Sequence, residues 1–274
     1  MHNQTMIYDS AKRKHPALEE LLALFQYRDL IYQLVRRDIV ARYKRSILGI
    51  AWTMLNPLGT MLVMVVVFSH VFSGTENYAG YVLTGIIVWT MFSQSTSMAM
   101  SSMVWGSQLF QQIYLPRTSF VLSTILASMV NFILSLVPLG LIFLITGVPL
   151  RPSVLLLPVF LIFLFSFSLG VALLLSTLAV FFPDVSDFYP VLLTAWMYLS
   201  PIIMPLEFYR QILNGLLLYI NPFYYLINLF RILVFDGFIP HLLTWGATAF
   251  VSFGALIIGW IFFCHKADTF AYHV

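Results

Sequence analysis

Residues 154–182 read VLLLPVFLIFLFSFSLGVALLLSTLAVFF and contain no charged side chain. A helix needs about 20 apolar residues to cross the hydrocarbon core of a bilayer, and this run of 29 residues exceeds that length. Backbone amides in lipid have to form hydrogen bonds within their own segment, so the run predicts a transmembrane α-helix.

The whole chain shares this apolar character. Of its 274 residues, 60% are apolar and 9% are charged, whereas a soluble domain carries about 25% charged residues. So little charge could not cover a water-facing surface, which excludes a soluble globular protein. The net charge of +3 is too small to indicate binding of nucleic acid. One cysteine, Cys264, excludes an internal disulfide and a multi-cysteine metal site.

Further apolar runs predict an all-α integral membrane protein with six transmembrane helices. The predicted spans are 52–73, 80–104, 119–146, 154–182, 188–204 and 241–263. Region 205–235 differs, because Asn214, Gly215 and the pair Asn221-Pro222 interrupt an ordinary lipid-facing helix. We predict a re-entrant or extracytoplasmic helical hairpin in this region, before the last span.

The positive charges predict the orientation of the chain. Residues 1–51 contain nine of its 14 Lys and Arg residues, and loops on the cytoplasmic side carry the excess of positive charge. With six spans, both termini are therefore cytoplasmic. The predicted parts are a cytoplasmic N-terminal part with an interface helix (1–51), a transmembrane domain (52–265) and a cytoplasmic tail (266–274). The polar N-terminus does not resemble a cleaved signal peptide.

The segment before the first span is amphipathic. At helical spacing its apolar side consists of Leu24, Tyr27, Ile31, Leu34, Val35 and Ile39. The cationic residues assigned to this interface helix are Arg36, Arg37, Arg42, Lys44 and Arg45. Such a helix lies in the plane of the lipid headgroups. Two interpretations stay open: a plain anchor on an anionic leaflet, or the frame of a lateral doorway for a lipid-linked substrate.

The sequence shows no energy source for transport. It has no phosphate-binding loop, since no glycine is followed by lysine. The five clearest spans contain no Asp, Glu, Lys or Arg, although proton- or sodium-coupled transporters usually keep ionisable groups there. No general acid–base constellation is evident, so we expect a conduit driven by a partner, with no catalytic residue, metal or cofactor in this chain.

Asp184 and Asp187 form a close acidic pair in the segment FFPDVSDFYP. A membrane glycosyltransferase could use such carboxylates to hold a divalent metal. However, the pair follows Pro183 at the cytoplasmic start of a predicted helix, where Asp is a favoured capping residue. Helix capping or contact with a partner is therefore the preferred interpretation.

Five segments give the chain a family resemblance. They are RDIVARYKRSILGIAWTMLNPL (37–58), IYLPRTSF (113–120), FFPDVSDF (181–188), LSPIIMP (199–205) and YINPFYYLINLFRILVF (219–235). In this order they resemble the permease subunit of bacterial ABC-2-type polysaccharide exporters, the family that handles O-antigen, capsule and teichoic acid. The resemblance covers nearly the whole chain.

The resemblance implies a homodimer of six-helix subunits in the bacterial plasma membrane. It also implies two separate ATP-binding cassette subunits, which would bind the ATP and Mg. The implied cargo is a glycan on a polyprenyl-diphosphate lipid, exported to the outer face. The residues that the resemblance assigns to coupling with the ATPase are Gln108, Gln111, Tyr114, Pro116 and Arg117, with Asp184 and Asp187 as a second contact.

Residues 93–103, SQSTSMAMSSM, are unusually polar for a lipid-facing helix. One interpretation is that the hydroxyls bond carbonyls of their own helix or pack against a neighbouring helix. The other is a hydrated translocation path, on which Gln94, Ser97 and the flexible Met98 contact sugars. Aromatic side chains that could stack on sugar rings are Trp89, Phe92, Trp196, Tyr198 and Tyr224; most aromatics of such a chain face lipid instead.

Glu207, Arg210 and Arg231 stand in an otherwise apolar region. An ion pair among them could pin the hairpin and close an outer gate; the alternative is independent contact with headgroups or water. Two other functions compete with polysaccharide export. They are a membrane enzyme acting on polyprenyl-linked sugars, supported only by Asp184 and Asp187, and an ABC-2 permease for a small molecule.

Overall fold

The computed structural model describes residues 16–44, 46–105, 116–149, 151–211 and 215–266, and this part of the chain contains helices and no strand. The elements are α1 (Pro16–Gln26), α2 (Arg28–Tyr43), α3 (Ala51–Phe68), α4 (Tyr78–Trp105), α6 (Thr118–Thr146), η2 (Pro152–Leu156), α7 (Leu157–Phe181), α8 (Asp184–Leu199), α9 (Leu206–Gln211), α10 (Leu216–Ile220), α11 (Pro222–Arg231), the π-helix η4 (Ile232–Asp236) and α12 (Leu242–Lys266).

Four segments are long and apolar enough to cross a bilayer, namely α3, α6, η2 with α7, and α12. An all-helical membrane protein is thereby confirmed. Helix α4 has 28 residues but includes the polar stretch 93–103. Helix α8 has 16 residues and is about 24 Å long, less than the roughly 30 Å of a hydrocarbon core. The six-span topology stays a prediction.

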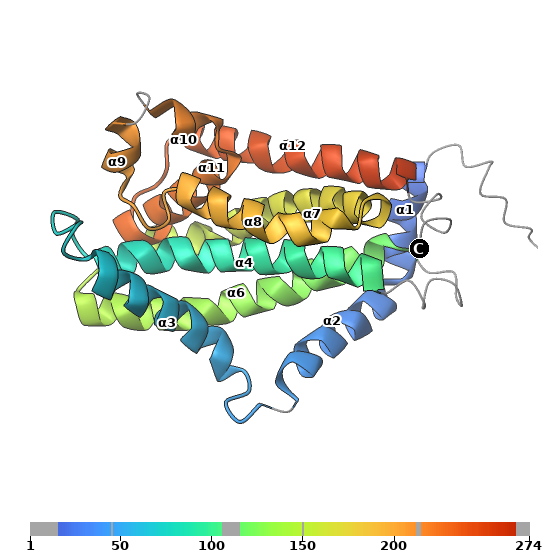
Figure 1. The fold of residues 1–274 in the computed structure, drawn as a ribbon, viewed down its shortest axis with the longest axis horizontal. Coiled ribbons are helices and arrows are strands. Elements are labelled where there is room, and N and C mark those ends of the chain that lie inside the picture. The colour runs from blue at the N-terminus through green and yellow to red at the C-terminus, as the bar shows by residue number, and fades with distance from the viewer. Residues whose placement is uncertain (1–15, 45, 106–115, 150, 212–214, 267–274) are drawn as a thin grey trace, which may run out of the picture.

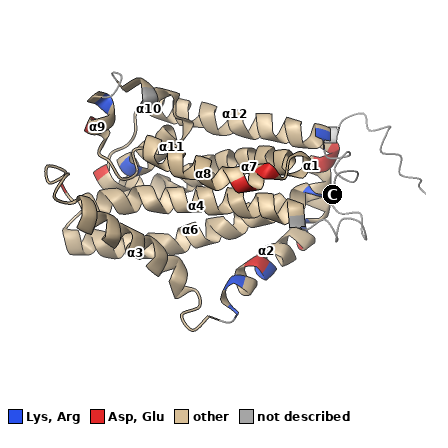
Figure 2. Ribbon diagram, viewed as in Figure 1, with Lys and Arg blue, Asp and Glu red and all other residues tan. Residues whose placement is uncertain are grey.

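The long helices lie side by side, and the short ones gather at the ends (Figure 1). Helix α1 crosses one end, where it packs on α12 and its Ala17 carbonyl accepts a hydrogen bond from Trp260 Nε1 at 3.2 Å. Helices α9 and α10 lie at the opposite end. Acidic and basic residues are concentrated on α2 and toward the two ends, and the middle of the bundle is almost free of them (Figure 2).

The segment of the predicted interface helix forms two helices in the structure, and its place at the lipid headgroups stays a prediction. The break falls at Tyr27, between α1 and α2. Helix α2 packs against α6; its Ile31 and Leu34 are buried, whereas Arg36 and Arg37 are exposed. The apolar side that the spacing predicts is therefore the side that contacts the protein.

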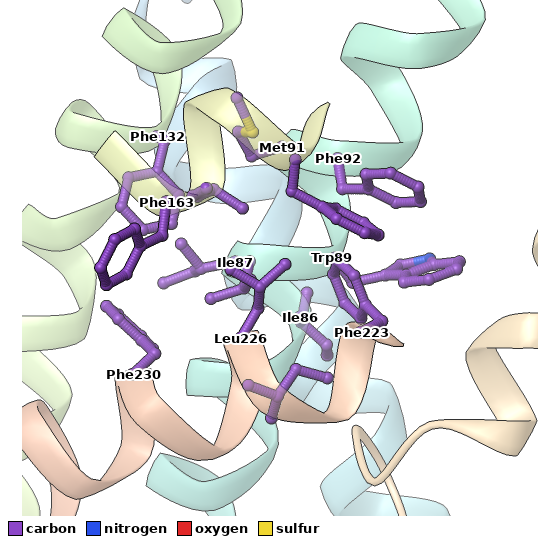
Figure 3. Close-up of a cluster of buried hydrophobic side chains, with 14 of the residues drawn as sticks. Ile86, Ile87, Trp89, Met91, Phe92, Phe132, Phe163, Phe223, Leu226 and Phe230 are labelled. Carbon is purple, nitrogen blue, oxygen red and sulfur yellow. The ribbon is translucent and has the colours of Figure 1, made fainter. Parts of the chain in front are cut away.

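Aromatic rings fill the interior between α4, α6, α7 and α11 (Figure 3). The ring centroids of Phe92 and Phe223 are 4.9 Å apart, and those of Trp89 and Phe223 are 5.1 Å apart. Phe92 has no exposed surface, and Trp89 is 7% exposed. Both rings are packed against other rings in this subunit, and their role as sugar-lining groups stays a prediction.

Between α8 and α9 the chain is not helical, and its backbone carbonyls accept hydrogen bonds from side chains. The carbonyls of residues 198–204 all receive hydrogen bonds from side chains of other elements. The donors are Tyr78 and Tyr81 of α4, Tyr209 of α9, Asn221 before α11, and Arg231 at the end of α11. We call residues 198–204 the carbonyl segment.

Arg231 is the central donor of this arrangement. Its Nη2 donates to the carbonyls of Tyr81 at 3.0 Å and Ile202 at 3.1 Å, its Nη1 donates to Pro201, and its Nε donates to Thr84 Oγ1 at 3.3 Å. The guanidinium also lies over the Tyr81 ring, 3.5 Å from its centroid. Arg231 thus joins α4, the carbonyl segment and α11.

The predicted ion pair among Glu207, Arg210 and Arg231 is wrong. Within the described chain neither Glu207 nor Arg210 forms an ion pair with Arg231, which is 7% exposed and surrounded by carbonyls. A guanidinium offers five donors in a planar fork. The carbonyl segment supplies more acceptors for these donors than a single carboxylate could, so Arg231 bonds carbonyls and not Glu207.

We expect Arg231→Ala to destabilise the subunit by about 3 kcal/mol, because it removes four buried hydrogen bonds, leaves the Ile202 carbonyl without its side-chain donor and leaves a cavity beside the Tyr81 ring. Arg231→Lys should recover part of this loss, since an ammonium keeps the charge but not the fork. The measurement is the thermal unfolding midpoint of the purified membrane protein. Glu207→Ala is the matched control and should leave the midpoint unchanged; equal midpoints for Arg231→Ala and Glu207→Ala would contradict this assignment.

Candidate functional site

A cleft of about 570 Å³ opens between α3, α4 and α6, next to the last turn of α2. Eleven of the 18 side chains that line it are polar, although apolar atoms make up most of its accessible wall. The polar side chains are Arg42 and Tyr43 from α2, Thr53 and Asn56 from α3, Thr90, Ser93, Gln94 and Ser97 from α4, and Ser128, Asn131 and Ser135 from α6. We call this site the polar cleft.

Helical spacing explains why these side chains converge. On α4 the polar positions 93 and 94 each lie three or four residues from both 90 and 97, and on α6 positions 128, 131 and 135 follow each other by three and four residues. Residues at these spacings lie on one face of a helix. Helices α4 and α6 pack together, so their two polar faces meet at the same cleft.

Direct hydrogen bonds tie the neighbouring helices to α6 at the cleft. Tyr43 Oη donates to Asn131 Oδ1 at 2.9 Å, which attaches the end of α2. Ser135 Oγ lies 3.3 Å from the Thr53 carbonyl, which attaches α3, and 2.9 Å from the carbonyl of Asn131 on its own helix. The walls of the cleft are thus held at defined positions by a few polar contacts.

Arg42 is the only charged side chain among the described residues that line the cleft. Its guanidinium contacts the sulfur of Met98 on α4. Apolar groups complete the wall, among them Trp52, Met91 and Phe132. The site therefore combines a single positive charge and several neutral donors and acceptors with a wall that is otherwise largely apolar.

Several neutral groups of the cleft have unused hydrogen-bonding capacity. Ser128 is 3% exposed, and its hydroxyl has no partner within the described chain. Across the same described ranges the side-chain amides of Asn56 and Gln94 also form no hydrogen bond. Buried polar groups are normally paired; of these three only Ser128 is buried, while Gln94 is half-buried and Asn56 exposed, so Ser128 is the group that marks the cleft as a place where a polar ligand would be bound.

Some residues of the polar stretch 93–103 of α4 form hydrogen bonds within the protein, and others line the polar cleft, so each of the two predicted interpretations fits a part of it. Ser95 and Ser102 donate to carbonyls of their own helix, at 3.0 Å from Phe92 and 2.7 Å from Ala99. Thr96 bonds the Tyr189 hydroxyl of α8 at 2.7 Å. Gln94, Ser97 and Met98 instead line the polar cleft, where Arg42 of the predicted interface helix joins them.

The remaining predicted path residues lie away from the cleft. Trp196 donates from Nε1 to Asn221 Oδ1 at 2.8 Å and packs against Phe92. Tyr198 is exposed near the end of α8. Tyr224 packs edge-on against Tyr219, with ring centroids 6.3 Å apart. The structure does not bring these three residues together with Gln94 and Ser97.

The structure describes only some of the predicted coupling residues. Gln108, Gln111 and Tyr114 lie outside the described residues, as does Arg45 of the predicted interface helix. Pro116 is buried and Arg117 half-buried just before α6, and Lys44 is exposed after α2. Their role in coupling stays a prediction.

Asp184 and Asp187 occupy the first turn of α8, and both are exposed. The N-cap is Pro183, and neither carboxylate forms a side-chain capping bond there. Their position instead suits the positive end of the helix dipole. No group of three or more His, Cys, Asp or Glu residues that could hold a metal occurs in the part of the chain that the structure describes.

Sequence reasoning missed Ser128, Asn131 and Ser135. Their spacing of three and four residues within the predicted span 119–146 was a usable signal, because polar residues repeated on one face of a membrane helix mark a side that does not face lipid. Thr53 and Asn56 near the start of the first span carry a similar but shorter signal.

Comparison with known proteins assigns the chain to a family. Residues 29–235 match the ABC-2 type transporter family. The chain is 29% identical over 250 residues to the O-antigen export system permease protein RfbA of Myxococcus xanthus, an alignment that covers 90% of this chain and 96% of that protein. A protein of the same name from Klebsiella pneumoniae is 26% identical over 217 residues, covering 78% and 83%. Since the family match spans more than half of its length, the chain belongs to the ABC-2 type transporter family.

Proposed function

We propose that the chain is the membrane permease subunit of an ATP-driven exporter that moves a lipid-linked polysaccharide from the cytoplasmic to the outer face of a bacterial plasma membrane. The observation that carries this proposal is the near-complete alignment with an O-antigen export permease. The polar cleft supports it, because a helix bundle that carries sugars through lipid needs a polar surface inside the membrane.

The energy for export would come from partner subunits. The sequence has no phosphate-binding loop, so the proposal includes two ATP-binding cassette subunits that bind ATP and Mg, and a homodimer of this chain. The starts of α6 and α8 lie toward the end of the bundle that carries α1 (Figure 1). With cytoplasmic termini, this end would receive the ATPases, and α9 and α10 would lie at the outer face as parts of a hairpin.

The doorway interpretation of the interface helix gains support from the polar cleft. Helix α2 ends at Tyr43, and its last two residues line the cleft together with the start of α3. A lipid-linked substrate that follows α2 along the headgroups would therefore reach polar side chains at the point where α2 ends. A plain anchor would not require that connection.

Removal of the chain tests the proposal. In cells that make a polyprenyl-linked polysaccharide, deletion should abolish surface glycan and cause lipid-linked glycan to accumulate inside, and the intact gene should restore export. The chain should also co-purify with an ATPase subunit. Unchanged surface glycan after deletion would refute the proposal. Glycosyl transfer by the purified chain without an ATPase would favour a membrane enzyme that acts on polyprenyl-linked sugars. Loss of small-molecule export alone would favour an ABC-2 permease for a small molecule.

A charge reversal tests the coupling contact on α8. The double variant Asp184→Lys/Asp187→Lys should lower transport-linked ATPase activity several-fold, because the exposed carboxylates would meet the docked subunit at close range. The subunit should stay folded, since both side chains are exposed. Glu207→Lys, a reversal on α9 at the opposite end, serves as the control. Unaltered ATPase activity in the double variant would exclude these residues from the contact.

A further inference from the structure

We propose that the polar cleft binds the sugar residues of the cargo that lie next to its lipid diphosphate, and that it discriminates between lipid carriers with and without sugar. This inference rests on the proposed function and adds a ligand class to a specific site. The cleft would then check the cargo for attached sugar before export begins, independently of the identity of the distal polymer.

The chemistry of the lining matches sugars better than phosphate. A diphosphate attracts several cations, whereas Arg42 is the sole charged group among the described lining residues. Sugar hydroxyls donate and accept hydrogen bonds, and so do the side-chain amides of Asn56, Gln94 and Asn131 and the hydroxyls of Ser97 and Ser128. A neutral, hydroxyl-rich ligand is therefore the natural partner of this wall.

Ser128 gives the clearest sign that a ligand belongs in the cleft. Its hydroxyl is buried and, within the described residues, unpartnered, yet the residue lines the cleft. A buried hydroxyl without a partner is costly, and a helix serine can usually bond a carbonyl of its own helix, as Ser123 does at 2.9 Å. A sugar hydroxyl in the cleft would satisfy Ser128, and the amide of Gln94, which lines the same cleft, offers a further hydrogen bond to the sugar.

The size and shape of the cleft fit a short saccharide. Its volume of about 570 Å³ is in the range of roughly 300–1,000 Å³ found for small-molecule sites, so it can hold a few sugar rings. Trp52 and Met98 offer apolar surface for the C–H faces of the rings. Arg42, supplied by the last turn of α2, is placed to meet one phosphate beside the first sugar.

Binding to the purified full-length chain in lipid nanodiscs tests this inference without nucleotide or export. The probes are a polyprenyl diphosphate that carries a disaccharide and the same lipid diphosphate without sugar. We expect the intact chain to bind the sugar-bearing probe about tenfold more tightly. Ser128→Ala and Gln94→Met should each reduce this advantage about threefold or more, as loss of a hydrogen bond predicts, and should leave binding of the sugar-free probe unchanged.

Ser176→Ala is the matched control. Ser176 of α7 is likewise buried and unpartnered in the described chain, but it does not line the cleft, so this variant should keep the full sugar preference. Thermal midpoints of all variants verify that they are folded.

Three outcomes would overturn the inference: equal affinity for the two probes, no binding of the sugar-bearing probe, or a full sugar preference in the Ser128 and Gln94 variants. None of them bears on whether deletion of the chain stops export, so the inference can fail while the proposed function stands. Conversely, normal export after deletion would refute the proposed function and leave the measured sugar preference intact.

Discussion

The structure depends on one constraint, which is that backbone polar groups inside an apolar bundle have to be hydrogen-bonded. Long helices satisfy this constraint through their own backbone hydrogen bonds. The non-helical backbone between α8 and α9 cannot do so, and the carbonyls of the carbonyl segment instead accept hydrogen bonds from tyrosines, an asparagine and Arg231 of three other elements. Because these donors come from α4, α9 and α11, satisfying the backbone at this turn also fixes the positions of the helices that surround it.

The same constraint distinguishes the two polar regions of the bundle. In the carbonyl segment every carbonyl from residue 198 to 204 has a side-chain donor, so an ordinary structural role accounts for the region. In the polar cleft, the buried hydroxyl of Ser128 and the half-buried amide of Gln94 have no partner in the described chain. Under our proposal, a bound ligand would supply the missing partners.

Periodic features of the sequence predicted much of this arrangement. The long apolar runs predicted α6, α7 and α12 within a few residues of their observed bounds, and the predicted apolar stripe contains Ile31 and Leu34, the two buried residues of α2. Contacts between distant segments were not predictable in this way. The interaction of Arg231 with Pro201 and Ile202 depends on how α11 returns to α4, and the close approach of Gly170 on α7 to Gly259 on α12 is likewise set by the crossing of two helices. Neither leaves a local pattern.

Arg231 and Arg42 show why residue type alone could not assign function here. Both are arginines beside apolar helices, and the sequence favoured Arg231 as a gating group because its neighbours are so apolar. Its environment explains that position differently, since a buried guanidinium surrounded by carbonyls has its donors occupied and would lose them by moving. Arg42 is half-buried and contacts only the weak acceptor Met98 among the described residues. A cation with unused donors at the edge of an incomplete polar wall can exchange its partner for an anionic group, and that availability, more than its charge, makes Arg42 the better candidate to meet a substrate.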